Sequence, residues 1–226
     1  MNNTYIAIPT GERTAKAVKC IEAWQATGVK VCVYTWDKET KKALTQKRLL
    51  ARNVPKVDIL LTGERQSFAK LQNLMAREIG DWDVLICGAD DLFPSSDVEL
   101  IPRAAAEVPG TILWAHDGLF GQQPTHPIIT RQWYDKHGDI FDEAFKHNFC
   151  DTDLFFRCGR MGEIVDCRKF ISFDHRHPSK TGARKDALYR YGDRTFASDK
   201  AYFELKHAGT TQLPHIMTLD MEVAAA

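Results

Sequence analysis

The sequence lacks closely paired cysteines, a long apolar run and an excess of charge of either sign. The six cysteines show no C-x-x-C spacing, which argues against a zinc knuckle or a disulfide framework and for a reducing compartment. They are Cys20, Cys32, Cys87, Cys150, Cys158 and Cys167. No segment approaches the roughly 18 apolar residues of a membrane span. Lysine plus arginine equals aspartate plus glutamate at 30 each, so total charge gives no electrostatic case for nucleic acid.

What remains is the composition of a water-soluble globular protein. The 226 residues are 44% hydrophobic and 27% charged, with a mean hydropathy of −0.34. The first residues, Met-Asn-Asn-Thr-Tyr, have no basic region followed by an apolar one, so we expect no secretory signal and a cytoplasmic protein without a membrane partner. The length favours one large domain over two small ones.

Strand-like and helix-like segments alternate along the first 90 residues. Apolar, β-branched runs predict strands near residues 5–8, 29–37, 57–63 and 83–87, and helical spacing predicts helices over 14–27 and 67–79. Residues 38–56 are basic and polar and are interpreted as a connection. This order predicts an α/β fold with a mostly parallel central sheet.

The second half is less regular. We expect a strand within 110–118, a strand that ends in a turn over 127–138, a helix over 151–157, a strand or a pair of strands over 163–178, and a helix over 199–207. No repeat and no linker interrupts the chain, so residues 1–226 are predicted to form one domain, with halves of about 1–94 and 95–226.

Polar residues follow the predicted strands of the first half. In open α/β sheets ligands gather at the carboxyl ends of strands, so these residues should converge on one crevice. They are Pro9 to Arg13, Asp37, residues 62–65 and the adjacent pair Asp90 and Asp91. Oxygen ligands such as paired carboxylates suit Mg²⁺ and Mn²⁺. Alternatively, Asp90 and Asp91 are two solvent-exposed acids in a turn and bind no ligand.

Two later segments carry further candidates. In "FISFDHRHP" the alternation of a strand places His175 and His177 on the same face as apolar residues. The two histidines are therefore either metal ligands or core histidines that bond a backbone carbonyl. In "HNFCDTDLFFR" Asp151 and Asp153 begin a helix, where the dipole favours anions. One of them would cap the helix, which leaves the other as a general base.

These motifs, in this order, resemble the GT-A glycosyltransferases, particularly the family 2-like branch and its small bacteriophage members. The resemblance extends over about Tyr5 to Pro178. The matching positions are Ile8-Pro9-Thr10 with Arg13, Asp37 after the second strand, Lys70 and Asn73 in "SFAKLQN", Ala89-Asp90-Asp91 as the end of an Asp-x-Asp-Asp motif, Asp151 and a late histidine.

The resemblance implies a Rossmann-like GT-A fold whose first half binds a nucleotide-sugar, with a UDP-sugar as the expected donor. It places Pro9, Thr10, Arg13, Asp37, Asn73 and Ala89 at the donor, with Arg65 and Lys70 adding charge near the phosphates or lying on a solvated face. Asp90, Asp91 and His175 or His177 would hold Mn²⁺ or Mg²⁺. Asp151 would deprotonate an acceptor hydroxyl, which gives inversion at the sugar. Two positions depart from the family pattern, because Gly88 replaces its first aspartate and Cys150 replaces the acid before Asp151.

The acceptor is predicted less directly. Residues 157–194 contain ten Lys or Arg against five Asp or Glu, a net charge of +5, with Tyr189 and Tyr191 among them. A basic surface with aromatics can follow a nucleic-acid backbone. With the phage-like resemblance it makes a hydroxymethylated pyrimidine in DNA a candidate acceptor, turned out of the stack. A solvated charged face, with a glycan or lipid-linked acceptor, is the alternative.

Three other protein classes remain open from the sequence. A sugar-phosphate nucleotidyltransferase would share the crevice, but "IPTGERT" lacks the glycine-rich loop that such enzymes show after the first strand. A non-catalytic DNA- or carbohydrate-binding relative would not need Asp151. A zinc hydrolase with Asp90, His175 and His177 as ligands fits less well, because no H-x-x-x-H pair is present.

Overall fold

The structure is a computed structural model that describes residues 3–50, 57–118, 121–182, 185–210 and 214–219. In this part of the chain an eight-stranded sheet has the order β10-β8-β6-β7-β4-β1-β2-β3. Its strands are β1 Thr4–Thr10, β2 Lys30–Thr35, β3 Ile59–Thr62, β4 Val84–Cys87, β6 Ile112–Trp114, β7 Ile128–Thr130, β8 Ile164–Asp166 and β10 Ile216–Thr218. Only β7 runs antiparallel to its described neighbours, so the α/β fold with a mostly parallel central sheet is confirmed.

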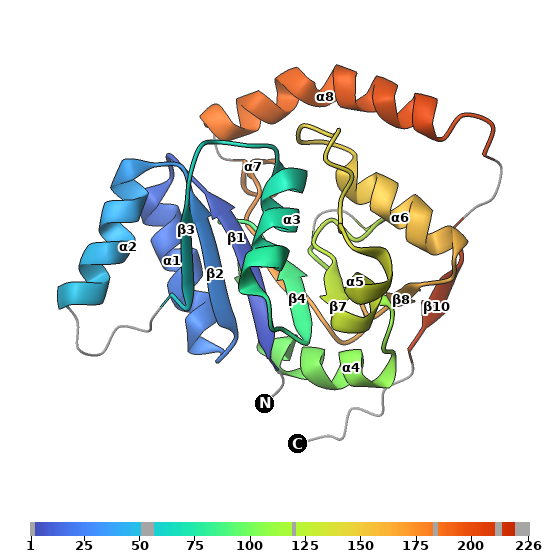
Figure 1. The fold of residues 1–226 in the computed structure, drawn as a ribbon, viewed down its shortest axis with the longest axis horizontal. Coiled ribbons are helices and arrows are strands. Elements are labelled where there is room, and N and C mark those ends of the chain that lie inside the picture. The colour runs from blue at the N-terminus through green and yellow to red at the C-terminus, as the bar shows by residue number, and fades with distance from the viewer. Residues whose placement is uncertain (1–2, 51–56, 119–120, 183–184, 211–213, 220–226) are drawn as a thin grey trace.

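Helices cover both faces of the sheet, and one long helix lies across the end of the sheet at which β1 and β2 finish (Figure 1). The long helix is α8, Ala187–Lys206. The others are α1 Thr14–Ala26, α2 Lys38–Leu50, α3 Phe68–Ile79, the 3₁₀ turn η1 Ser96–Leu100, α4 Ile101–Glu107, α5 Arg131–His137, α6 Cys150–Arg160 and α7 Pro178–Thr181. A second, two-stranded sheet pairs β5 Leu92–Pro94 with β9 Phe173–His175.

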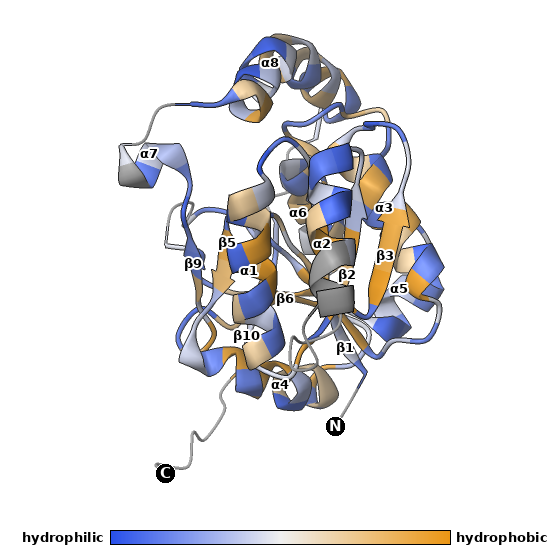
Figure 2. Ribbon diagram, turned by 90° about the vertical axis from the view of Figure 1, so that its left-hand side faces the viewer, coloured by the Kyte–Doolittle hydropathy of each residue, from blue (hydrophilic) through white to orange (hydrophobic). Residues whose placement is uncertain are grey.

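Alternation along the strands builds two apolar cores, one on each face of the sheet. In β1, Tyr5 and Ala7 pack toward α3 and α5, whereas Ile6 and Ile8 pack toward α1 and α4. Figure 2 shows the resulting contrast between hydrophobic strands such as β3 and β5 and the more hydrophilic α8. Full burial of such aliphatic side chains stabilises the fold by about 1.5–3 kcal/mol each.

Local signals explain where α3 begins and ends. The Ser67 hydroxyl accepts a hydrogen bond from the Lys70 backbone N–H at 3.2 Å, which caps the first turn. Gly80 follows the last turn with a φ of 71°, a conformation that glycine adopts without a Cβ clash. The helix therefore begins at Phe68, one residue after the predicted start, and ends at the predicted residue, Ile79, shortly before β4.

The basic connection expected over 38–56 is wrong in its first part, because Lys38–Leu50 form α2; residues 51–56 lie outside the described chain. The Asp37 carboxylate caps this helix through the Thr40 backbone N–H at 2.8 Å. The turn expected after β7 is helix α5. No described helix combines the length and the apolarity needed to cross a bilayer.

The helix expected over 199–207 begins twelve residues earlier, as α8. Its buried residues are Gly192, Thr195 and Asp199, which are small or polar, so no apolar period marks its first turns. The segment 163–178 contains two strands that belong to different sheets, β8 in the large sheet and β9 in the small one.

Candidate functional site

A cavity of about 400 Å³ opens at the carboxyl ends of β1 and β4, beneath α8. Loops after strands, the first turn of α6 and one side of α8 form its walls. Of the residues nominated from the sequence, those that line it are Pro9, Arg13, Arg65, Ala89, Asp90, Asp91, Asp151, His175 and His177. All four strand ends that were predicted to converge contribute residues to the lining. At the end of β2, however, the lining residue is Trp36 and not the predicted Asp37.

The other four nominated residues lie outside the lining. Thr10 is fully buried beneath it and donates a hydrogen bond to Asp90 at 2.7 Å. Asp37 caps α2, and Lys70 is exposed in the first turn of α3. Asn73 is buried on α3, where its amide donates to the Phe141 carbonyl at 2.8 Å and accepts from the Phe141 N–H at 3.0 Å. The side chains of Asp37 and Asn73 therefore bond other parts of the protein and do not line the cavity.

The carboxylate of Asp90 is neutralised by a cation from a distant part of the sequence. Its Oδ1 lies 2.8 Å from Nη1 of Arg13, and its Oδ2 accepts from Thr10, so both oxygens have partners. Burial raises the pKa of Asp90 above its usual value, although Arg13 opposes the shift. Asp186, at the start of α8, holds the other side of the Arg13 guanidinium at 2.7 and 2.8 Å.

Asp91 has different partners from its neighbour. Its Oδ1 faces Nε2 of His175 at 3.7 Å, and its Oδ2 accepts a short hydrogen bond from the Tyr189 hydroxyl and lies 3.6 Å from Nζ of Lys16. Burial alone would raise the pKa of Asp91, but His175, Lys16 and Tyr189 outweigh it and lower this pKa to about 2. Asp91 is therefore a buried carboxylate that stays ionised at neutral pH.

The pairing of β5 with β9 brings His175 to this carboxylate. The antiparallel register sets His175 opposite Leu92, the residue after Asp91. On the other side of the ring, Nδ1 lies 3.4 Å from Oδ2 of Asp117, and the ring of His126 packs edge-on at 4.7 Å. Of the two predicted histidines, His175 faces Asp91.

The other predicted histidine, His177, has a local partner. Its Nδ1 accepts the Ser179 backbone N–H at 3.1 Å and so caps α7. Its ring packs edge-on against Tyr189 at 4.8 Å and lines the cavity.

Asp151 is a further carboxylate that lines the cavity. It lies in the first turn of α6, where its Oδ2 accepts from the Gln123 side-chain amide and its Oδ1 from the Thr152 backbone N–H, each at 2.9 Å. Burial raises the pKa of Asp151 above the usual aspartate value. A carboxylate with a raised pKa and a fixed orientation is suited to accept a proton.

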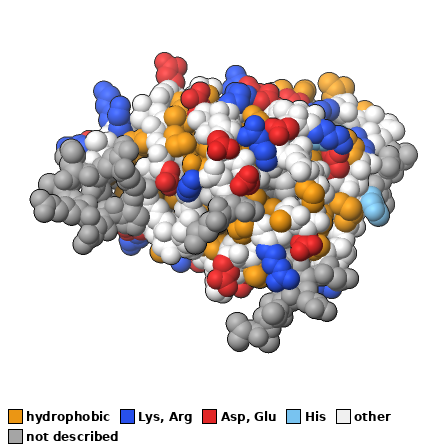
Figure 3. All heavy atoms as spheres, turned by 60° about the horizontal axis from the view of Figure 1, so that its bottom comes forward, with side chains coloured by type: hydrophobic (Ala, Val, Ile, Leu, Met, Phe, Trp, Pro, Cys, Tyr) orange, Lys and Arg blue, Asp and Glu red, His pale blue; other side chains and the backbone are white. Residues whose placement is uncertain are grey.

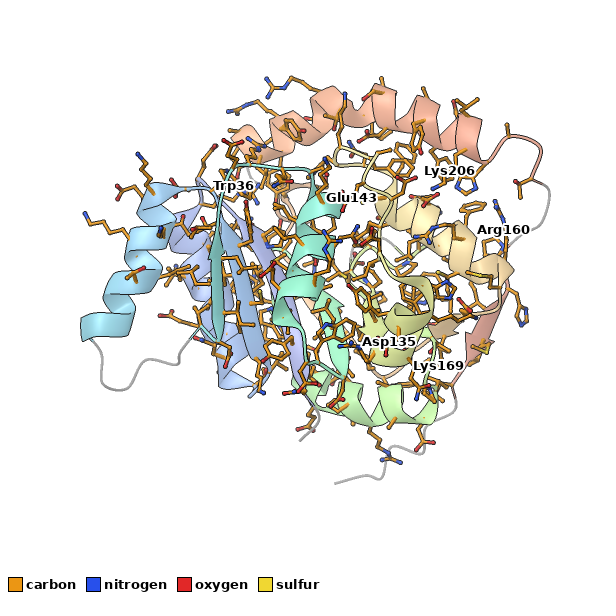
Figure 4. All side chains as sticks on the ribbon, in the orientation of Figure 1. Trp36, Asp135, Glu143, Arg160, Lys169 and Lys206 are labelled. Carbon is orange, nitrogen blue, oxygen red and sulfur yellow. The ribbon has the colours of Figure 1, made fainter. Side chains whose placement is uncertain are left out.

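The second acid of this helix has a structural role. Asp153 is fully buried and pairs with Arg157 at 3.1 Å, and with Lys206 and His207 at 2.9 Å each. Figure 4 labels Lys206 on the side of α8 that faces α6. The sequence left open which of the two acids is free, and the structure directs Asp153 to α8 and Asp151 to the cavity.

An aromatic group forms the wall near the end of β2, where Figure 4 labels Trp36. The Arg65 guanidinium lies over the ring of Tyr191 at 4.5 Å and over Trp36 at 5.6 Å. A Cβ at Gly11 would come within 2.3 Å of the indole, so this position needs glycine. Sequence analysis missed Trp36, although it directly precedes Asp37.

Three other polar residues of the site were also missed. Gln123 donates to Asp151, Asp117 lies beside the ring of His175, and Nδ1–H of His126 donates to the Cys87 carbonyl at 3.0 Å. Asp117 follows a predicted strand, as Asp90 follows another, and that position is the one signal that could have found it. No local pattern marks Gln123 or His126.

The donor atoms at Asp91 and His175 suit a divalent cation. A carboxylate oxygen and an imidazole nitrogen face each other at 3.7 Å, and Mn²⁺ accepts both kinds of ligand. Among the described residues no three His, Cys, Asp or Glu side chains form a ready ligand group. The pair therefore fits an ion whose shell a ligand's phosphates complete, which is the usual arrangement for Mg²⁺.

Five cations of the basic segment 157–194 have an acidic partner within 4 Å, and one of them is Arg157 with Asp153. Arg176 and Lys180 both contact Asp174, at 2.7 and 3.4 Å. Lys185 pairs with Asp193 at 2.8 Å, and Arg168 pairs with Asp166 at 2.6 Å; residue 184 lies outside the described chain. On the face that was at the bottom in Figure 1, Figure 3 shows both charge signs interspersed.

No known protein-family profile matches the sequence, and no curated protein matches it. Solved structures do match. Mannosyltransferase PcManGT from Pyrobaculum calidifontis, in complex with GDP-Man and Mn²⁺, aligns with a TM-score of 0.57 and 12% identity over 94% of this chain and 76% of its own. TarS from S. aureus aligns with a TM-score of 0.58 and 10% identity over 93% of this chain and 46% of its own.

The fold is the Rossmann-like GT-A fold. A shorter TarS structure, residues 1–349, aligns over 93% of this chain with a TM-score of 0.54 and 13% identity, and over 76% of its own length. The same TarS residues have been solved in complex with UDP, with a TM-score of 0.51 and 12% identity over 76% of this chain and 60% of that chain. The likeness to small bacteriophage members rests on sequence motifs alone.

Proposed function

We propose that this protein is a glycosyltransferase that moves a sugar from a nucleotide-sugar to an acceptor hydroxyl. The observation that carries the proposal is the placement of Asp91 with His175 and of Asp151 around one cavity of a GT-A fold. The structural neighbours with bound GDP-Man and UDP support a nucleotide-sugar as the donor class. A UDP-sugar is the donor we expect.

The donor occupies the half of the cavity at the ends of β1, β2 and β4. Pro9 and Ala89 supply backbone at the base of the cavity, and Trp36 with Arg65 supplies an aromatic and cationic wall. Arg65 lines this half of the cavity, and its positive charge would stabilise the negative charge of the departing nucleoside diphosphate.

A divalent cation, Mn²⁺ or Mg²⁺, bound by Asp91 and His175 would neutralise further charge on the diphosphate. Asp90 orients Arg13 in place of ligating the ion, because both of its oxygens already have partners. His177 lines the cavity and packs on Tyr189.

The reaction is an in-line displacement at the anomeric carbon. The acceptor oxygen forms the new bond to this carbon while the bond to the diphosphate oxygen breaks, and the electron pair leaves with the nucleoside diphosphate. The acceptor proton passes to the Asp151 carboxylate, which Gln123 holds in orientation. Attack on the face of the sugar carbon opposite the departing diphosphate inverts the configuration of this carbon.

A hydroxymethylated pyrimidine in DNA stays a prediction for the acceptor, with a glycan or lipid-linked hydroxyl as the alternative. The ion pairs of Lys180 and Lys185 reduce the free charge that a DNA backbone would meet. Charge reversal of Lys180 and Lys185, followed by retention on double-stranded DNA at low salt, tests the DNA acceptor; equal retention of both proteins excludes it.

The proposed function is tested by product analysis. Incubation with UDP-glucose or GDP-mannose and Mn²⁺ should release free UDP or GDP, and Asp151→Asn should reduce the rate on the order of 10²–10⁴-fold, as expected for loss of a general base. Release of pyrophosphate from a nucleoside triphosphate and a sugar phosphate would indicate a nucleotidyltransferase instead. Binding of donor without turnover, unchanged in Asp151→Asn, would indicate a non-catalytic relative.

A further inference from the structure

The segment that carries Asp151 into the cavity is held by a single buried carboxylate from α8. Asp199 is 2% exposed and accepts three consecutive backbone N–H groups. Its Oδ1 accepts from Lys146 at 3.1 Å, and its Oδ2 accepts from His147 at 3.0 Å and from Asn148 at 2.8 Å. Three charge-assisted bonds fix the path of the backbone at this point.

Further contacts bind the same segment to α8. The Asn148 side-chain amide donates to the Gly192 carbonyl at 2.8 Å and to the Thr195 hydroxyl at 3.2 Å. His147 lies so close to Gly192 that a Cβ there would come within 2.6 Å of its ring. Phe149 stacks on Phe203 at a centroid distance of 5.6 Å.

The chain turns from this segment directly into α6. Phe149 has a φ of 64°, in the left-handed region that non-glycine residues seldom adopt unless their surroundings impose it. Its carbonyl accepts the Asp153 N–H at 2.8 Å, the first hydrogen bond of α6. The orientation of the first turn, and with it that of Asp151, is therefore set by a segment whose own backbone donors end on Asp199.

We propose that Asp199 is the positioning residue for Asp151. This inference rests on the proposed function. Asp199 acts through the backbone of residues 146–149, and without its three hydrogen bonds the first turn of α6 no longer holds the Asp151 carboxylate against the cavity. Displacement of a catalytic group by about 1 Å can reduce a rate on the order of 100-fold.

Asp199→Asn is the variant of choice, because an asparagine oxygen keeps part of the anchor and lets the chain fold. With UDP-glucose or GDP-mannose, kcat should fall on the order of 10–100-fold while the KM for donor stays within about twofold. In the absence of ligand, amide hydrogen exchange of residues 146–148 should be faster in Asp199→Asn than in the wild-type protein. Asp193→Asn, an exposed residue of the same helix that pairs with Lys185, is the matched control and should change neither.

A double-mutant cycle separates positioning from general stability. If Asp199 acts through Asp151, the Asp151→Asn/Asp199→Asn protein is no slower than Asp151→Asn alone, because groups that act as a unit are not additive. A merely structural role would multiply the two losses, and that result overturns the inference, as would unchanged exchange of residues 146–148 in Asp199→Asn.

Turnover of neither donor by the wild-type protein would refute the proposed function and not the inference. In that case ¹³C NMR of the aspartate carboxyl carbons decides. The Asp151 signal should move in Asp199→Asn and not in Asp193→Asn. An Asp151 signal that stays in place in both variants overturns the inference.

Discussion

At the scale of single residues, adjacent carboxylates acquire different properties from their partners. Asp90 is locked between Arg13 and Thr10, whereas Asp91 faces a histidine, a lysine and a phenol. The sequence presents the two acids side by side with no local cation. The groups that neutralise them come from α1, β9 and α8, so only the tertiary structure distinguishes the two roles.

Asp37 provides a direct test of a residue that the sequence places at the nucleoside. We expect Asp37→Ala to lower the free energy of unfolding by about 0.5–2 kcal/mol, the usual cost of losing a helix cap, because Thr40 loses its acceptor. The dissociation constant for donor nucleotide should stay within about twofold. Urea unfolding and isothermal titration with UDP and GDP measure the two quantities.

Arg65→Ala is the matched comparison for Asp37→Ala. Arg65 lines the cavity and is partly exposed, so its loss should weaken nucleotide binding and leave the unfolding free energy nearly unchanged. If Asp37→Ala instead weakens nucleotide binding and leaves the unfolding free energy unchanged, Asp37 contacts the donor and the capping role is wrong.

Tyr189 tests the contact between α8 and the acid pair. Tyr189→Phe removes the hydroxyl that donates to Asp91 and keeps the ring on Arg13, which lies 4.2 Å from its centroid. We expect a loss of about 1.5–3 kcal/mol in unfolding free energy, the range for a hydrogen bond to a charged group. Tyr191→Phe, on the same helix but with its ring against Arg65, controls for a general loss of phenol groups.

At the scale of elements, several boundaries followed from the sequence and others could not. The strands of the first half, α3 and the start of α6 show the apolar spacing of their type, so the sequence predicts where they lie. The register of β9 against β5 could not, because residues that are some 80 positions apart pair only through the fold. Asp117 and His126 both contact His175, which that pairing brings to the site. The sequence gives no sign of His126, and the only sign of Asp117 is its position after a predicted strand.

The first turns of α8 show a second reason for a missed element. A helix is recognised by apolar residues at helical spacing, but α8 buries Gly192, Thr195 and Asp199. Gly192 faces the His147 ring, Thr195 bonds the Asn148 side-chain amide, and Asp199 accepts the backbone N–H groups of both. Its inner face is polar because it satisfies backbone donors. Both the length of α8 and its role at the cavity were therefore hidden.

The contact between α5 and β8 predicts an acid-dependent part of stability. Glu163 accepts hydrogen bonds from Lys136 at 2.5 Å and from Trp133 at 3.0 Å and lies 2.9 Å from His137. Burial alone would raise the pKa of Glu163, but these partners outweigh it and lower this pKa. Its contribution is thus present above the unfolded-state pKa of about 4.3 and is lost as pH falls through the lower folded value.

Glu163→Gln should therefore destabilise the protein at pH 7, and the gap to wild type should narrow as pH falls below about 4. Urea unfolding at a series of pH values measures this gap. Glu204→Gln, in an exposed pair with Lys200, should change stability by less than about 0.5 kcal/mol at any pH. A gap that stays constant from pH 7 to pH 3 would contradict the assignment.

At the scale of the whole molecule, ligand binding should report on the cavity through stability. A nucleotide-sugar at 100 times its dissociation constant adds about 2.7 kcal/mol to the folded state. For a domain of this size that corresponds to a rise of roughly 5–10 °C in Tm. A thermal-shift panel of UDP-, GDP- and dTDP-sugars, each with and without Mn²⁺, should show a metal-dependent rise for one nucleotide class.

The same panel has a built-in control. Asp91→Asn should lose the Mn²⁺-dependent part of the shift, because the carboxylate that faces His175 is gone. A shift of equal size with and without Mn²⁺ in the wild-type protein would show that donor binding does not involve a metal ion.

The position of α8 in the chain has a consequence for the order in which the molecule matures. The helix that closes the cavity and anchors the segment before α6 is translated after the strands β1 to β9. During synthesis on the ribosome, the strands of the central sheet up to β8 can assemble before α8 covers the cavity, and the edge strand β10 follows α8. The cavity would then be complete, and able to bind a substrate, only after residues 187–206 have left the exit tunnel and packed as α8.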